Sequence, residues 1–174
     1  MRMAGMVWLG AGRRLWFFIL ILVGLDQISK QWMLNLVFTP PRIIEVTNFF
    51  NLVPVWNRGI SFGFFSNHPE FVRFATIILA GIVIGFLARQ LKRYPLLLKF
   101  AASTIIAGAA GNMIDRLVYG RVVDFLDFHL VGYHWPAFNI ADVAISIGVF
   151  LWICAIVSGR DNMPSDEVSD TTTK

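Results

Sequence analysis

Residues 96–116 read LLLKFAASTIIAGAAGNMIDR, an apolar run that ends in three polar residues, Asn112, Asp115 and Arg116. Its length matches the roughly 20 residues that a helix needs to cross a bilayer. The Ala and Gly residues between positions 101 and 111 are small enough for another helix to approach closely. The polar residues are spaced i, i+3 and i+4, so they share one helix face. The stretch predicts a tightly packed membrane helix with a polar end.

Three further apolar segments, residues 15–37, 71–91 and 138–158, are also long enough to span a bilayer. The chain has 174 residues, of which 56% are hydrophobic and 15% charged, and its mean hydropathy is +0.64. This composition excludes a soluble protein, because soluble domains are about 45–50% apolar and about 25% charged. Residues 43–57 are rich in β-branched and aromatic residues broken by Asn and Pro, which predicts short strands.

We therefore predict an all-α membrane protein with four transmembrane helices and a small β-rich element between the first and second helices. Residues 1–158 form one membrane domain, and the polar residues 159–174 form a disordered tail. Lys and Arg gather before the first helix, around the turn between the second and third, and after the fourth. The positive-inside rule then puts both termini in the cytoplasm and the β-rich element outside. The net charge of +4 reflects these residues, and no nucleic-acid-binding motif is present.

This orientation places the polar residues near the membrane on one side. Asp26 and Lys30 lie in the outer half of the first helix, one turn apart, which suits an ion pair. Residues 112–116 end the third helix on the same side. Asn139 and Asp142, at i and i+3, begin the fourth helix there. A charge in or beside hydrocarbon costs at least a few kcal/mol, so it persists where it is paired or used.

The carboxylates divide into two groups. Asp115 beside Arg116 suits a structural ion pair or a hydrogen-bond acceptor, and Asp127 suits a solvated loop carboxylate. Asp124, in the outer loop, and Asp142 have no basic partner on a helix face. Two such carboxylates in a partly dry site would share a proton, as in aspartic peptidases. The spacing alone leaves alternatives open: Asp142 could cap a helix, and Asp115 or Asp127 could replace either member of the pair.

Other chemistries have less support in the sequence. The chain has a single cysteine, no His or Glu spacing typical of a metal site, and no Gly-x-Ser-x-Gly motif. A small ion- or proton-conducting transporter is an alternative, but it predicts polar residues along the whole membrane depth. The inner halves of the second, third and fourth helices are instead apolar. A non-catalytic scaffold is a further alternative, in which replacing the carboxylates changes stability only.

Five short motifs, in this order, resemble the lipoprotein signal peptidase family, also called signal peptidase II. They are DQISK (26–30), NRGISF (57–62), GAAGNMIDR (108–116), VVDF (122–125) and FNIAD (138–142). The resemblance extends from the first helix through the fourth. One departure is the Ala-Gly pair at 107–108, where the family often has Gly-Gly, and Ala is still small. Because the motifs occur together in a chain with four membrane helices, the resemblance is specific.

The resemblance implies a bacterial inner-membrane aspartic endopeptidase that removes signal peptides, cutting just before a diacylglyceryl-modified cysteine. It implies that Asp124 and Asp142 are the catalytic pair, near the periplasmic face, and that no metal or organic cofactor is needed. Eight residues would support the site or bind substrate: Asp26, Lys30, Asn57, Gly59, Asn112, Asp115, Arg116 and Asn139. The expected partners are lipid-modified prolipoproteins and membrane lipids, with no nucleic acid, and we expect a monomer.

Overall fold

The computed structural model describes residues 4–59 and 69–159. Its elements are α1 (Ala4–Leu36), β1 (Ile44–Thr47), β2 (Phe50–Asn57), α2 (Pro69–Gln90), α3 (Leu96–Tyr119), β3 (Val122–Leu130), β4 (Tyr133–His134) and α4 (Ile140–Val157). All four predicted helices are present, and each is long and apolar enough to cross a membrane. α1 starts earlier and α3 ends later than predicted. The predicted tail lies outside the described residues, apart from Gly159.

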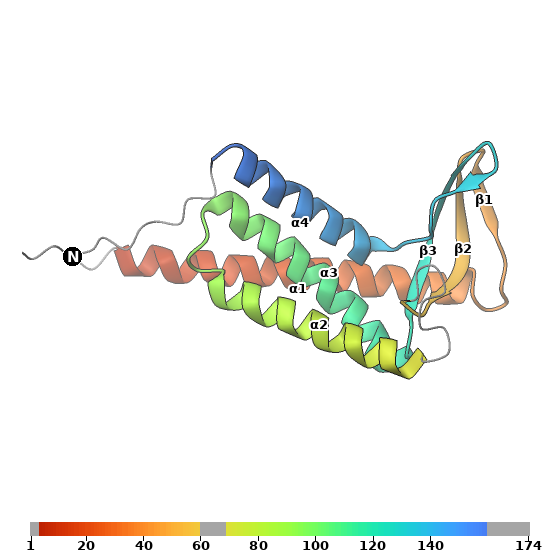
Figure 1. Cartoon of the computed structure of the whole chain (residues 1–174), viewed down its shortest axis with the longest axis horizontal. Coiled ribbons are helices and arrows are strands. Elements are labelled where there is room, and N and C mark those ends of the chain that lie inside the picture. Colours follow the sequence, from red (N-terminus) through yellow and green to blue (C-terminus); the bar gives the residue numbers. More distant parts are fainter. Residues whose placement is uncertain (1–3, 60–68, 160–174) are drawn as a thin grey trace, which may run out of the picture.

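α3 is the central helix of the bundle and contacts α1, α2 and α4 (Figure 1). Its small residues explain this position. A Cβ added at Gly108 would collide with the backbone oxygen of Ala141 on α4, and one at Gly148 would lie 2.5 Å from Thr104 Oγ1 on α3. The two helices therefore touch backbone to backbone, as the small residues of α3 predicted.

The sheet is larger than predicted. The protein is a helical bundle with a four-stranded sheet, which corrects the description of the fold as all-α. Its four strands are antiparallel, in the order β1-β2-β3-β4. The segment 43–57 supplies β1 and β2, as expected, but β3 and β4 come from the connection between α3 and α4. Asp124 pairs across the ladder with Val55, so it lies on a strand and not in a loop. The sequence of β3 contains two Asp residues, which conceal its strand character.

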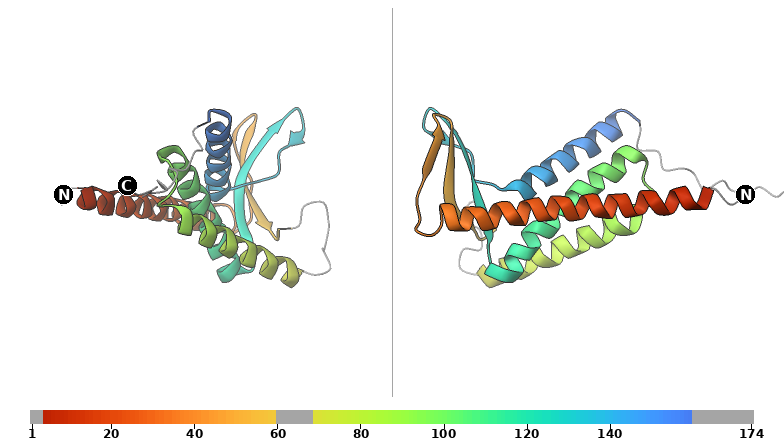
Figure 2. Two further views of the ribbon diagram at one scale, coloured as in Figure 1. Left: turned by 60° about the vertical axis from the view of Figure 1, so that its left-hand side comes forward. Right: turned by 180° about the vertical axis from the view of Figure 1, so that it is seen from behind.

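β3 follows α3 directly and keeps the chain at the ends of α1 and α3. Gly120, with φ of 72°, caps α3 in the left-handed conformation that glycine adopts without steric cost. Val123 and Phe125 of β3 then pack against Met33 and Val37 near the end of α1. The strands run across the helix axes and cover one end of the bundle (Figures 1 and 2). This packing fixes the intervening Asp124 close to the helix ends.

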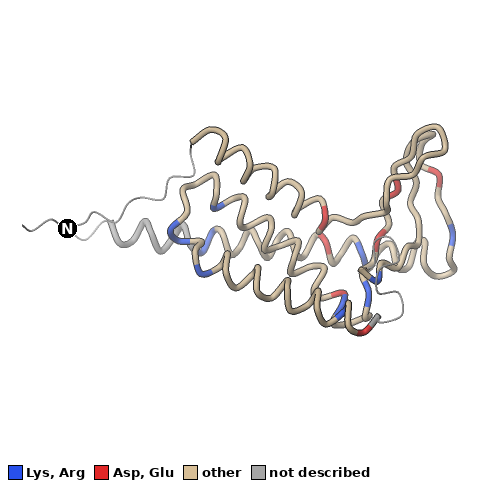
Figure 3. The backbone as a smooth tube through the Cα atoms, viewed as in Figure 1, with Lys and Arg blue, Asp and Glu red and all other residues tan. Residues whose placement is uncertain are grey.

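Charged residues mark the two ends of the bundle differently. The acidic residues gather at the sheet end together with several Lys and Arg residues, whereas the charged residues around the turn between α2 and α3 at the opposite end are Lys and Arg (Figure 3). The apolar middle of the bundle separates the two. The polar residues that the sequence placed on one side of the membrane thus do lie at one end of the molecule.

Candidate active site

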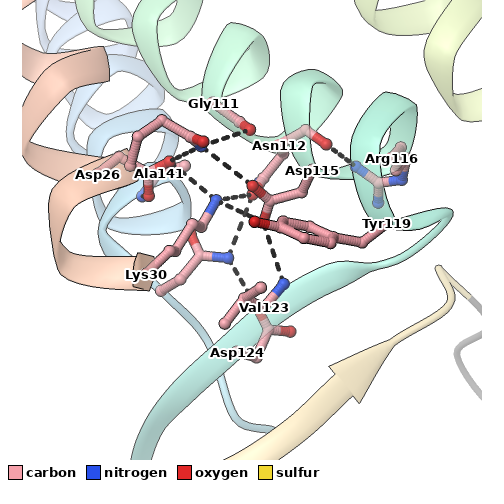
Figure 4. A network of polar contacts seen from close by, with 12 residues as sticks. Asp26, Lys30, Gly111, Asn112, Asp115, Arg116, Tyr119, Val123, Asp124 and Ala141 are labelled. Carbon is pink, nitrogen blue, oxygen red and sulfur yellow. Dashed lines mark hydrogen bonds and ion pairs between the residues drawn. The ribbon is translucent and has the colours of Figure 1, made fainter. Parts of the chain in front are cut away.

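Lys30 lies at the centre of a buried ion-pair cluster (Figure 4). Its Nζ is 2.8 Å from Asp26 Oδ2 on the preceding turn of α1 and 3.0 Å from Asp115 Oδ2 on α3. No side chain of the three is more than 2% exposed. The i, i+4 ion pair predicted for α1 is therefore present. One cation between two carboxylates compensates much of the cost of burying each charge.

The partner of Asp115 is Lys30 and not its neighbour Arg116, which corrects the pairing expected from the sequence. Adjacent residues on a helix point in different directions. Arg116 instead donates through Nη1 to the Asn112 backbone oxygen at 3.2 Å. Arg116 lies near both Asp124 and Asp142, and its charge interacts with them. Its charge also interacts with Asp115, but its hydrogen bond goes to the backbone and not to a carboxylate of the buried cluster.

The two carboxylates of the cluster also position the candidate dyad. Asp115 Oδ2 accepts a hydrogen bond of 3.0 Å from the backbone N–H of Val123, the residue before Asp124. Asp26 Oδ1 accepts one of 2.9 Å from the backbone N–H of Ala141, which directly precedes Asp142. Each bond fixes the backbone next to one member of the dyad. The ion-pair cluster thus supports the backbone beside both members of the dyad.

Gln27 is a member of this cluster that the sequence reasoning missed. Its Nε2 is 3.1 Å from Asp26 Oδ2, 3.0 Å from Asp115 Oδ1 and 3.2 Å from the Gly111 backbone oxygen. An amide group supplies two donor hydrogens, which these acceptors share. The available signal was a polar amide inside an apolar helix, next to Asp26. Gln27 joins α1 to α3 beside Gly111. A side chain at position 111 would have no room there, because its Cβ would collide with Asp26 Oδ2.

Asn112 and Asn139 connect the cluster to the dyad. Asn112 Oδ1 accepts from Lys30 Nζ at 3.1 Å, so its Nδ2 is turned outward and donates to Asp142 Oδ1 at 2.7 Å. Asn139 Nδ2 donates to Asp124 Oδ1 at 2.6 Å and to Asn112 Oδ1 at 3.2 Å. A continuous hydrogen-bonded path therefore joins Lys30 to both carboxylates. The structure brings together all of these predicted site residues.

Asp142 also caps α4, so the alternative left open from its spacing is realised. Its Oδ2 accepts from the Asn139 backbone N–H at 3.2 Å, and Asn139 Oδ1 accepts from the Asp142 backbone N–H at 3.1 Å. This reciprocal pair is a capping box, which satisfies two backbone donors at the start of a helix. Because Oδ1 faces Asn112, capping uses only one oxygen of Asp142 and fixes the direction of the other.

Asp124 is 1% exposed and has a different environment. Asn57, at the end of β2, donates through Nδ2 to Asp124 Oδ2 at 2.8 Å. Asn57 Oδ1 in turn accepts from the Gly59 backbone N–H at 2.6 Å, and the φ of 75° at Gly59 favours glycine. Burial, followed by the charge of Asp142, raises the pKa of Asp124 to about 6, against hydrogen bonds from Asn57 and Asn139 that lower it.

Asp127 is buried, which corrects the prediction of a solvated loop carboxylate. It accepts a hydrogen bond of 3.1 Å from Asn51 Nδ2 and lies 2.9 Å from His134 Nδ1. Burial alone would raise the pKa of Asp127, but hydrogen bonds from His134 and Asn51 and the charges of His134 and His129 lower it overall. Asp127 therefore holds β4 to the sheet. Within residues 4–59 and 69–159, no three His, Cys, Asp or Glu side chains converge as a metal site would.

The fold is shared with solved bacterial membrane enzymes. One such structure has a TM-score of 0.70 and 28% sequence identity, covering 95% of both chains. A second has a TM-score of 0.66 and 30% identity, covering 85% of this chain and 93% of the other. Four membrane-length helices and a network of buried carboxylates at one end agree with this likeness. Fold and site together define a multi-pass membrane enzyme.

The comparison of sequences is more specific. The family model of signal peptidase (SPase) II matches residues 18–158. Lipoprotein signal peptidases of Burkholderia multivorans, Ralstonia nicotianae and Cupriavidus necator are 47%, 45% and 48% identical over 137, 148 and 143 residues. These regions cover 77%, 84% and 80% of this chain and 81% of each relative. The chain therefore belongs to the signal peptidase II family, the lipoprotein signal peptidases, and is an aspartic endopeptidase.

Proposed function

We propose that this enzyme removes the signal peptides of diacylglyceryl-modified prolipoproteins by cutting just before the lipidated cysteine. The catalytic pair would be Asp124 and Asp142, at the periplasmic face of the bacterial inner membrane. One observation carries the proposal: Asn139 and Asn112 direct amide donors at these two carboxylates from a single buried network. The other carboxylates of that network, Asp26 and Asp115, are occupied by Lys30.

The pair would act by general acid–base catalysis, with one proton shared between the carboxyl groups. We assign the shared proton to Asp124, whose pKa is raised to about 6 by burial and the charge of Asp142. Asp142 takes a proton from water as the water oxygen attacks the scissile carbonyl carbon. Asp124 gives its proton to the carbonyl oxygen, which produces a gem-diol. Asp142 then protonates the cysteine nitrogen as the C–N bond breaks, and Asp124 recovers a proton from the gem-diol.

Arg116, Gly59 and Asn57 would form the substrate side of the site. A Cβ built on Gly59 lies 3.6 Å from Arg116 Nη2, so a side chain there would crowd the guanidinium group. Arg73 donates through Nε to the Arg116 backbone oxygen at 2.9 Å and holds this end of α3. The guanidinium can offer several N–H donors to peptide carbonyls. A substrate helix would enter sideways from the bilayer and present its scissile bond at this depth.

The location of the network disfavours the transporter alternative. A conducting path would need polar side chains through the membrane depth. In α4 the charged residue is Asp142 in the first turn, and the rest of the helix is apolar apart from Ser146. The network described here is formed by residues of one chain. We propose that the enzyme works as a monomer.

The test is a cleavage assay with purified enzyme and two versions of one precursor, with and without the diacylglyceryl group on cysteine. We expect cleavage of the lipidated precursor only, with mass spectrometry giving a product that begins at the modified cysteine. Glu45→Gln, on an exposed part of β1, serves as a control variant with unchanged rate. Equal cleavage of both precursors, or a cut elsewhere, would refute the proposed substrate.

A further inference from the structure

The turn between β3 and β4 has an unusual residue at its tip. It consists of Val131 and Gly132, with φ of 50° and 83°. Two-residue hairpin turns with both φ values positive favour Asn-Gly or Asp-Gly. A β-branched residue there is a steric outlier, and such outliers persist where something else holds them. Val131 is 89% exposed, so nothing in the described part of the chain packs against it to offset the strain.

The residues around Val131 are also apolar or aromatic and exposed. Leu130, Tyr133 and Trp135 are each at least 70% exposed. The chain from 128 to 138 contains no Lys, Arg, Asp or Glu. Tyr and Trp beside aliphatic residues are typical of the membrane–water interface, where one part of the ring is apolar and the other is wet. We call the set Leu130, Val131, Tyr133 and Trp135 the hairpin tip.

The hairpin tip is held in a fixed position. The buried carboxylate of Asp127 binds His134 Nδ1 at 2.9 Å. The His134 ring stacks on His129 with 4.9 Å between centroids, and the Trp135 backbone N–H donates to the Phe128 oxygen at 2.8 Å. These contacts leave the side chains of the hairpin tip exposed. An exposed apolar surface on a rigid support is the form expected of an anchor.

The position of the hairpin points to lipid as the partner. The strands run across the helix axes; β3 begins at the helix ends and carries its turn with β4 to the outer edge of the sheet (Figures 1 and 2). α4 has 18 residues, about 27 Å at 1.5 Å per residue, which nearly fills the ~30 Å hydrocarbon core. Ile140 therefore lies near the hydrocarbon boundary, and Trp135 precedes it by five residues in the chain. By contrast, Arg42 and Glu45 at the β1 edge are exposed charges.

We propose that the hairpin tip inserts into the lipid interface at the sheet end of the bundle. Lipid would then cover Val131, which the protein leaves exposed. The inserted tip would fix the height of β3, and with it Asp124, relative to the bilayer surface. This inference rests on the four membrane-spanning helices and does not depend on the proposed cleavage reaction. The partner is the bilayer surface, and not the substrate or a second copy of the chain.

The test uses a fluorescent label at the tip. In a Cys154→Ala background, which removes the single native cysteine, Val131→Cys is labelled with the environment-sensitive dye NBD. The full chain is reconstituted into vesicles of phosphatidylethanolamine and phosphatidylglycerol, with or without nitroxide-labelled lipids. Glu45→Cys, labelled in the same way, is the matched control. We expect blue-shifted emission from position 131 and at least twofold stronger quenching by nitroxide lipids there than at position 45.

Equal, water-like emission from both positions would overturn the proposal. A blue shift at position 131 that appears only when precursor is added, or only at high protein-to-lipid ratio, would identify a protein partner and overturn it as well. A second variant tests Val131 itself. Asn fits the left-handed turn, so Val131→Asn should fold, yet quenching of a label at Leu130→Cys should fall at least twofold. Unchanged quenching would show that Val131 takes no part in anchoring.

Discussion

At the scale of single residues, the site depends on amide groups whose orientation is set by a neighbouring charge. Lys30 can only donate, so it fixes Oδ1 of Asn112 as the acceptor. The Nδ2 of Asn112 must then face Asp142, which it reaches at 2.7 Å. Lys30 bonds to Asn112 and not to the dyad, yet its charge thereby sets which group of Asn112 contacts Asp142.

Replacement of Lys30 by Met should destabilise the protein strongly. The variant leaves Asp26 and Asp115 buried without their cation, and breaking a buried ion pair costs about 3–5 kcal/mol. We expect a large fall in the thermal midpoint and loss of cleavage. The double variant Asp26→Asn with Lys30→Met should recover part of the stability, since it carries one fewer unpaired charge. A thermal midpoint equal to that of wild type in the single variant would show that the ion-pair cluster does not stabilise the site.

Removal of the Asn57 amide should shift the pH dependence of cleavage. The pKa of Asp124 is raised to about 6, and the hydrogen bond from Asn57 lowers it from what burial alone would give. If loss of the shared proton sets the alkaline limb of kcat/KM, Asn57→Ala should move that limb to higher pH. Profiles of wild type and variant measure the shift. Asn51→Ala removes a donor to Asp127 instead, so it should leave the alkaline limb in place. A shift of the limb to lower pH in Asn57→Ala would contradict the prediction.

At the scale of elements, the contact between α3 and α4 is the one most sensitive to added volume. A Cβ at Gly148 would lie 2.5 Å from Thr104 Oγ1 and 2.7 Å from the Ala101 oxygen. Gly148→Ala should therefore separate the helices, and overpacking of this kind costs about 1–3 kcal/mol. Gly81→Ala on α2 is the matched control, because nothing lies within 4 Å of its Cβ. Thermal unfolding should show a lower midpoint for the first variant only; equal midpoints would contradict this packing.

The elements also show what a sequence pattern can and cannot predict. Helices are predictable because about 20 apolar residues in a row have few other structures available. β3 is not, because its partner β2 is distant in the sequence and a strand's stability depends on that pairing. The same limit applied to Asp115 and Asp127. Their ion-pair and hydrogen-bond partners, Lys30 and Asn51, are brought to them by the fold and not by local spacing.

At the scale of the whole molecule, the charge distribution predicts the orientation in the membrane. Lys and Arg surround the end opposite the sheet (Figure 3), so both termini should be cytoplasmic and the sheet periplasmic. A fluorescent protein that matures only in the cytoplasm, fused after Lys174, should fluoresce. Alkaline phosphatase inserted at the β1–β2 turn should be active, because that enzyme matures outside. The reverse pattern would invert the orientation and place the site on the wrong face.

The molecule as a whole joins a membrane bundle to a sheet that covers its end, and the candidate site lies where they meet. The sequence predicted which residues gather there, because orientation placed their polar groups on one side and the family motifs selected among them. It could not predict the path of hydrogen bonds from Lys30 through Asn112, nor the part of Gln27. Those depend on how three helices and a strand pack together, which no single segment encodes.

The most direct test of the central claim is the cleavage rate of the two isosteric variants Asp124→Asn and Asp142→Asn. Each keeps its size and can keep one of the two hydrogen bonds that its carboxylate accepts, so thermal unfolding should still show a folded protein. Each removes a carboxyl group that the reaction needs, so cleavage of a lipidated precursor should fall by at least 100-fold, the lower bound for losing a general acid or base. Glu45→Gln should cleave at the wild-type rate. Near wild-type cleavage by either dyad variant would contradict the account.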